Sequence, residues 1–358
     1  MATIESTTGS GSPALRSMGP GGVSGFILSF IRAAAFLAAM IGMTSGVLAD
    51  PIKTPAGFNL VQIIQIGPTV YIEGTGGWYQ VVQCEQEFCL EKTTAPSRPT
   101  APAGPDAMPE RQRAQVDRGQ VRAAWYSHPT TRYRHGILGD AIEAGQLNVQ
   151  LENGRQLTLT LPQNAVFEDL VPRLFDIDAD GAAEIVTLRS TPQRGGAVAI
   201  YKAGPDGIKH IQSLAEIGQG NRWLNIAGFH DWTGDGRADL AVVQTPHIGG
   251  TLRLYAFADG QFRQIRHAAG FSNHAIGSRA LDLSLNLDMD GDGIDDLLVP
   301  SADRRELRVL FPAKPGKKGR RIPLSTQVYH NLGLVSLSAH RHMIYADRDG
   351  NLYAQQLR

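Results

Sequence analysis

The sequence predicts an all-β protein whose larger part repeats a unit of four short strands. Glycine is abundant, at 40 of 358 residues, and aromatic residues make up only 7%, as is typical of many short strands joined by tight turns. An acidic motif returns three times at nearly equal intervals, and alternating apolar runs separated by turn residues fill those intervals. The intervals contain no amphipathic helical pattern, which argues against a helical repeat protein.

Residues 1–49 have the features of an export signal. Arg32 precedes an apolar run over 33–43, and small residues follow it up to Ala49. This order predicts a secretory signal peptide that is cleaved after Ala49. An uncleaved N-terminal anchor is the alternative, because 26–48 is long enough to span a bilayer. We therefore expect an exported protein, periplasmic or secreted, that contacts a membrane only through this segment.

Residues 50–92 are predicted to form a small β-meander. Strand-like runs at 60–66, 69–73 and 78–82 are separated by Gly-Pro and Gly-Thr-Gly-Gly turns. Cys84 and Cys89 follow, with four residues between them. In an exported protein such a pair indicates a disulfide, since a redox pair needs two intervening residues and a zinc site needs more ligands. The disulfide is expected to clip the meander.

Residues 93–120 are predicted to be a linker, because five prolines stand there among Ala, Ser and Thr. The repeated region then runs from 121 to 358. Its acidic motifs begin at Asp176, Asp231 and Asp288, which gives steps of 231 − 176 = 55 and 288 − 231 = 57 residues. A further step of 57 leads to a degenerate copy at 345–353, which lacks acids at two places and is not expected to bind a metal.

Each period holds four short strands, and this decides the predicted architecture. Four antiparallel strands repeating every fifty-odd residues are one blade of a β-propeller. Counting back and forward from the motifs gives five blades over 121–358. The last blade, 340–357, is incomplete, and we expect an upstream strand at 121–126 to close the ring so that no sheet edge is left open.

The spacing Asp-x-Asp-x-Asp-Gly-x-x-Asp/Glu is suited to calcium. Acids at places 1, 3 and 5 of a tight loop can point at one centre, glycine at place 6 permits the bend, and the carbonyl at place 7 and the acid at place 9 add ligands. The helices that flank an EF-hand are missing, because place 12 falls in apolar strands. The predicted Ca²⁺ ligands are Asp176, Asp178, Asp180, Ala182 and Glu184 in the first loop, Asp231, Thr233, Asp235, Arg237 and Asp239 in the second, and Asp288, Asp290, Asp292, Ile294 and Asp296 in the third. Thr233 replaces an acid, so the second loop should bind more weakly.

These loops could also be plain hydrophilic turns, but three copies in register argue against that interpretation. The segments 176–186, 231–241 and 288–298 resemble the FG-GAP/VCBS repeats of integrin α-subunit propellers and of many bacterial secreted proteins. The resemblance covers about 130–358. It implies a propeller with calcium loops on one face and ligand binding elsewhere, and it implies no particular ligand or activity.

The balance of 34 basic and 34 acidic residues argues against a generic nucleic-acid or anionic-membrane binder. No nucleophile elbow, phosphate loop or dinucleotide fingerprint is present, so no catalytic residue is predicted. The favoured interpretation is a non-catalytic module that binds a protein or a glycan. The alternatives are a polysaccharide-active lyase or hydrolase on the same propeller, and purely structural ions with the meander as the contact surface. We expect the basic run 314–321 to be a solvated loop. Trp223 and Trp232 flank the second acidic loop and could be sugar-stacking platforms, but we expect at least one of them to be a core residue.

Overall fold

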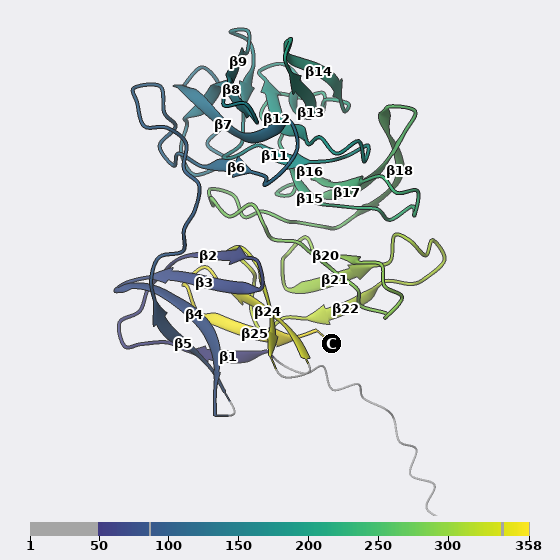
Figure 1. Cartoon of the computed structure of the whole chain (residues 1–358). Coiled ribbons are helices and arrows are strands. Elements are labelled where there is room, and N and C mark those ends of the chain that lie inside the picture. Colours follow the sequence, from purple (N-terminus) through teal and green to yellow (C-terminus); the bar gives the residue numbers. More distant parts are fainter. Residues whose placement is uncertain (1–48, 86, 338–339, 358) are drawn as a thin grey trace, which may run out of the picture. The chain divides into compact units, whose positions relative to one another are not determined.

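The structure, a computed structural model, describes residues 49–358 except 86, 338–339 and 358. Every regular element of this part is a β-strand, as Figure 1 shows. The predicted signal segment, 1–49, lies outside the described residues apart from Ala49. Within the described part of the chain, no helix has the length and apolar character needed to cross a bilayer.

Three groups of four antiparallel strands, each connected in sequence order, contain the acidic motifs, and the first of them belongs to a larger nine-stranded sheet. We number the four-stranded sheets as blades along the chain. Blade 3 is β11 (Arg173–Phe175), β12 (Glu184–Thr191), β13 (Gly195–Gly204) and β14 (Gly207–Ser213). Blade 4 is β15 (Leu224–His230), β16 (Asp239–Gln244), β17 (Thr251–Ala258) and β18 (Gln261–Ala269). Blade 5 is β19 (Leu285–Leu287), β20 (Asp296–Pro300), β21 (Glu306–Leu310) and β22 (Arg320–Pro323).

Two further sheets flank these three. Blade 2 is β6 (Arg113–Gln115), β7 (Val121–Thr130), β8 (Glu143–Leu151) and β9 (Gln156–Thr160), and the short β10 (Val166–Phe167) pairs with both β8 and β12. Blade 6 is β23 (Gly333–Leu337), β24 (His340–Ala346), β25 (Leu352–Gln356) and β1 (Asp50–Lys53). The β-propeller prediction is therefore confirmed: the strands from 113 onward lie in five blades, of which blades 2 and 3 are joined through β10 into one nine-stranded sheet.

The closing strand is not the one expected. β1 pairs antiparallel with β25, with Asp50 opposite Ala354, so the start of the described chain completes the last blade (purple beside yellow in Figure 1). The expectation that 121–126 closes the ring is wrong, because Val121–Thr130 is β7 and pairs with β6 and β8. The physical reason is burial: Ile52 is only 5% exposed and lies in the core that blade 6 shares with the meander.

The predicted meander is a four-stranded sheet of the same kind, which we number blade 1. It consists of β2 (Leu60–Ile66), β3 (Thr69–Gly74), β4 (Gly77–Cys84) and β5 (Glu87–Thr93). Cys84 and Cys89 form the predicted disulfide across β4 and β5, with their Cα atoms 6.1 Å apart. β5 also pairs in parallel with β1, which attaches blade 1 to blade 6.

The hydrophobic core lies between successive blades rather than in one centre. Separate clusters of buried apolar residues join blades 2 and 3, 3 and 4, 4 and 5, 5 and 6, and 6 and 1. Trp223 and Trp232 are 2% and 3% exposed and belong to these clusters, so the prediction that at least one is a core residue is confirmed, and both are. The Pro-rich segment 93–112 is also packed: Ala101 is buried against Ala123 and Trp125 of β7.

Candidate metal loops

The three acidic loops occupy the same corner of three neighbouring blades. Each connects the first strand of its blade to the second: β11 to β12, β15 to β16, and β19 to β20. The degenerate copy at 345–353 lies instead between the second and third strands of blade 6, where Asp347 caps a tight turn by accepting hydrogen bonds from the amides of Asp349 and Asn351. It is thus not at the position of the other three loops.

The three loops share one set of internal hydrogen bonds. The acid at place 1 accepts from the amide of the glycine at place 6, at 3.0, 2.8 and 3.0 Å, and the acid at place 5 accepts from the amide of place 7, at 2.8, 2.9 and 2.9 Å. The acid at place 9 accepts from the amide of place 2, at 2.8, 2.9 and 2.9 Å. Place 6 has a positive φ in every copy, 86°, 82° and 87°, which only glycine adopts without strain. The motif therefore specifies one loop conformation three times.

The loops are also linked from blade to blade. The amide of Ala238 in the second loop donates to the carbonyl of Ile177 in the first, at 3.0 Å. The indole of Trp232 donates to the carbonyl of Asp295 in the third, at 3.0 Å, and the Asp295 amide donates to His230 Nε2 at 3.3 Å. Holding one loop in shape thus helps to hold its neighbour.

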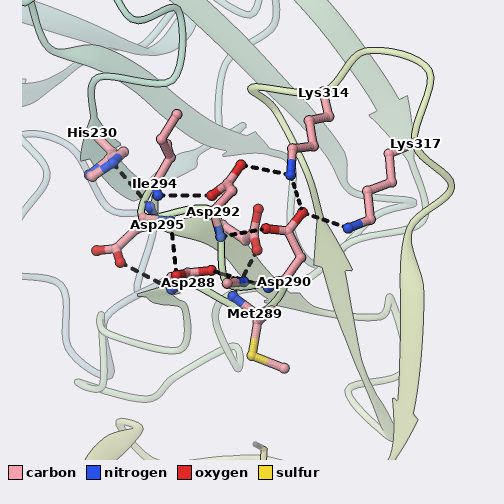
Figure 2. Close-up of polar contacts among 12 residues, drawn as sticks. His230, Asp288, Met289, Asp290, Asp292, Ile294, Asp295, Lys314 and Lys317 are labelled. Carbon is pink, nitrogen blue, oxygen red and sulfur yellow. Dashed lines mark hydrogen bonds and ion pairs between the residues drawn. The ribbon is translucent and has the colours of Figure 1, made fainter.

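The third loop gathers carboxylates most clearly, as Figure 2 shows. Oxygens of Asp288, Asp290 and Asp296 lie within 4.8 Å of one another, a spacing that suits a shared cation. Lys314 Nζ lies 2.8 Å from both Asp290 and Asp292, and Lys317 Nζ lies 2.5 Å from Asp290. These lysines belong to the basic run 314–321, which is exposed as expected for a solvated loop, but both also form ion pairs with the third acidic loop. No lysine of the described chain reaches Asp296.

The first loop already holds a cationic group of the chain itself. Asp176, Asp178 and Glu184 also bring oxygens within 4.8 Å of one another. Lys202 of β13 places its Nζ 2.7 Å from Asp178, 3.0 Å from Asp180 and 3.1 Å from Glu184. The ladder register, in which Ile185 faces Tyr201, puts Lys202 directly across the hairpin from Glu184. Calcium at this loop would compete with an ammonium group that is held in place by the sheet.

The second loop is the least suited of the three to bind a metal ion. It forms no group of three clustered carboxylates among the described residues. The Thr233 hydroxyl donates to Asp239 at 3.2 Å, and the Thr233 amide donates to the same carboxylate at 2.8 Å. The hydrogen bonds that the Asp239 carboxylate accepts therefore come from the loop itself. The lower affinity expected for this loop stays a prediction.

The carboxylates differ in their electrostatic surroundings. Hydrogen bonds from Lys314 and Lys317 lower the pKa of Asp290, and a hydrogen bond from Lys202 lowers the pKa of Asp180. Burial raises the pKa of the acid at place 9 in every loop: Glu184, Asp239 and Asp296. A bound cation would offset the cost of keeping these buried acids ionised.

A second titratable cluster is buried away from the loops. His135 Nδ1 lies 2.5 Å from Glu168, Ser190 donates to the same carboxylate, and Glu143 lies nearby. Burial, followed by the charge of Glu168, raises the pKa of Glu143 to about 10, and burial raises the pKa of Glu168. Glu143 is 2% exposed, so it is held as a neutral acid inside blade 2.

Neither this cluster nor the role of Lys202 was predicted from the sequence. The acids of the cluster have no shared spacing, and their partners come from distant turns. Pairing the two strands that follow the first motif would have placed Lys202 opposite Glu184. The other two blades have no lysine at this position, because the ladders put Ala256 opposite Asp239 and Phe311 opposite Asp296.

No family model and no curated protein matches the sequence. Among solved structures, the chain is similar to a rhamnogalacturonan lyase of Bacillus licheniformis at 13% identity and a TM-score of 0.40, covering 87% of this chain and 76% of that one. It is also similar to AofleA from Arthrobotrys oligospora at 11% identity and 0.40, covering 84% and 83%. The periplasmic gluconolactonase of Pseudomonas aeruginosa matches at 17% identity and 0.35, covering 72% and 68%. At these scores the similarities carry no argument about activity.

Proposed function

We propose that this chain is an exported, calcium-binding propeller of the FG-GAP/VCBS type that acts as a non-catalytic module for binding a protein or a glycan. The observation that carries the proposal is the shared geometry of the three acidic loops. Three copies of one nine-residue loop, with the same internal hydrogen bonds at the same corner of three blades, support a common role.

The third loop is the best candidate for calcium. Asp288, Asp290, Asp292 and Asp296, with the carbonyl of Ile294, would hold the ion, which would supply positive charge at the centre of the acids. Lys314 and Lys317 pair with Asp290 and Asp292, but no lysine of the described chain pairs with Asp296 at place 9. The first loop can be neutralised by Lys202, so we propose a smaller dependence on calcium there.

The proposed role of the ion is to stiffen the blades. The third loop contacts the second through Trp232 and His230, and the second contacts the first through Ala238. A cation that fixes one loop therefore restrains a row of three blades. Export is supported by the Cys84–Cys89 disulfide, which persists in oxidising compartments.

Thermal unfolding tests the proposal directly. The chelated protein should melt at a higher temperature as calcium is added, because a ligand that binds only the folded state stabilises it by about 2.7 kcal/mol at a hundredfold excess over the dissociation constant. Asp290→Asn/Asp296→Asn should reduce this response. Asp259→Asn, in the turn between β17 and β18, removes an exposed acid outside the loops and should leave the calcium response unchanged.

The result that would contradict the proposal is an equal melting temperature with calcium and with chelator. A response that survives the double substitution would also count against the third loop as the metal site.

A further inference from the structure

A large cavity lies among the innermost strands of the blades. Two adjoining hollows of about 850 and 990 Å³ share much of their walls. Those walls come from β2, β6, β11, β15, β19 and β23, the first strand of every four-stranded sheet, and from the Pro-rich segment that contains Arg98 and Arg111. Volumes of this size accommodate ligands of several rings.

The walls are strongly basic although the whole chain is neutral. Six arginines line the two hollows, Arg98, Arg111, Arg113, Arg173, Arg279 and Arg341, against two acids, Glu110 and Asp282. Concave walls of one sign of charge attract ligands of the opposite sign. An anion is therefore the ligand that this cavity favours.

Most of this charge is not neutralised by the protein. Arg279 pairs with Glu110 and Asp140, and Arg173 pairs with Asp169. Arg111 donates only to the carbonyl of Ala101, at 2.8 and 3.0 Å.

Arg113 donates to the amide oxygen of Gln150 and lies over the ring of Trp125 at 5.2 Å. Among the described residues, Arg98 and Arg341 have no hydrogen-bond or ion-pair partner for their guanidinium groups. These four arginines thus have no acidic partner in the described chain.

The remaining wall groups suit a hydroxyl-rich ligand. The amides of Gln62, Asn286 and Asn331 and the hydroxyls of Ser284 and Ser336 stand among the arginines, next to apolar residues such as Phe229 and Leu281. A planar guanidinium matches a carboxylate by two parallel hydrogen bonds, whereas amides and hydroxyls match sugar hydroxyls. Apolar surface beside them can cover the carbon face of a sugar ring.

We propose that this cavity binds an acidic oligosaccharide, one that bears carboxylates on its sugar rings, and that Arg98 and Arg341 recognise the carboxylates. The proposal deepens the binding function above and rests on it. It also assigns a role to the Pro-rich segment 93–112, which brings Arg98 and Arg111 to the cavity wall.

Calorimetric titration of the purified full-length protein tests this site. The probe is tetragalacturonate, with maltotetraose as the neutral oligosaccharide and a short single-stranded oligonucleotide as a second polyanion. We expect the acidic sugar to bind, and the neutral sugar and the oligonucleotide to bind at least tenfold more weakly. Arg98→Gln/Arg341→Gln should weaken acidic-sugar binding at least about tenfold, because each lost charged hydrogen bond costs a factor of ten or more.

The matched control is Arg155→Gln/Arg263→Gln, which removes the same charge from an exposed turn and from an exposed position of β18, both outside the cavity. The inference is overturned if tetragalacturonate does not bind to the folded protein, if the control pair weakens binding as much as the cavity pair, or if the oligonucleotide binds more tightly. Calcium-dependent melting is measured on the same samples. A normal calcium response without sugar binding rejects only the cavity ligand, whereas sugar binding without a calcium response rejects the metal part of the proposed function.

Discussion

Replacing Lys202 by methionine tests whether this residue acts as the counter-ion of the first acidic loop. The substitution removes the ammonium group but keeps an unbranched stem of similar length. It leaves Asp178, Asp180 and Glu184 without the group that now lies 2.7, 3.0 and 3.1 Å from them. In chelator we therefore expect the variant to be less stable than the parent protein.

The size of the loss follows from the exposure of the lysine. Burial acts to lower the pKa of Lys202, but hydrogen bonds to the three acids outweigh it and raise the pKa. The side chain is 38% exposed, so each pair is valued as a surface pair, and three such pairs contribute about 1–2 kcal/mol. An unfolding entropy of about 2.1 cal/mol/K per residue over about 310 residues gives ~0.65 kcal/mol/K, so the melting temperature should fall by about 2 °C.

Calcium should reverse the effect, because the vacated acids then form a site without an internal competitor. Melting curves in chelator and in calcium, with calorimetry for the number of bound ions, give the result. Lys209→Met is the control, since Lys209 lies on the same hairpin, is 66% exposed and pairs only with Asp206. Equal calcium responses and equal melting temperatures in Lys202→Met and the parent protein would refute the reasoning.

Three further outcomes are expected. Glu143 keeps its proton in the folded state, where its pKa is about 10, and loses it in the unfolded state above about pH 4.5, so it lowers stability as pH rises between these values. Glu143→Gln should therefore gain stability relative to the parent by more than about 1.4 kcal/mol at pH 9, and parallel stability–pH curves would contradict this. Ile52→Ala should cost about 2–4 kcal/mol in urea melts, while Lys53→Ala, at an exposed position of the same strand, costs little. Cys84→Ser/Cys89→Ser should lose about 2 kcal/mol, and reductant should then no longer affect the melting temperature; a continued response would exclude the disulfide as its cause.

The acidic loops could be predicted because their structure is local. The hydrogen bonds that all three copies share join residues within the same nine-residue stretch, such as Asp288 with Gly293 and Asp296 with Met289. Spacing alone therefore specifies the conformation. The four-strand period could be predicted for the same reason, because each hairpin is marked in the sequence by alternating apolar residues and by turn residues.

Long-range pairings left no such trace. β1 has four residues, too few to show a period, and its partner β25 lies about 300 residues further along the chain. The 57-residue period correctly predicted a turn at Asp347, but this turn follows the second strand of blade 6 rather than the first. A repeat period gives the spacing of the turns and does not say which strands they connect. Lys202 reaches its acids across a hairpin, and the cavity arginines come from separate parts of the chain. Such contacts depend on how the sheets are assembled.

The cavity and the acidic loops are consecutive features of the same strands. In blade 3, Arg173 of the cavity wall comes three residues before Asp176; in blade 5, Asn286 comes two residues before Asp288. Blade 4 has the same order, with Phe229 followed by Asp231. Fixing a loop therefore fixes the end of the strand that carries the wall residue. A cation on the acidic loops would therefore help to hold Arg173, Phe229 and Asn286 in place on the cavity wall, while the loop acids stay separate from the arginines that line the cavity.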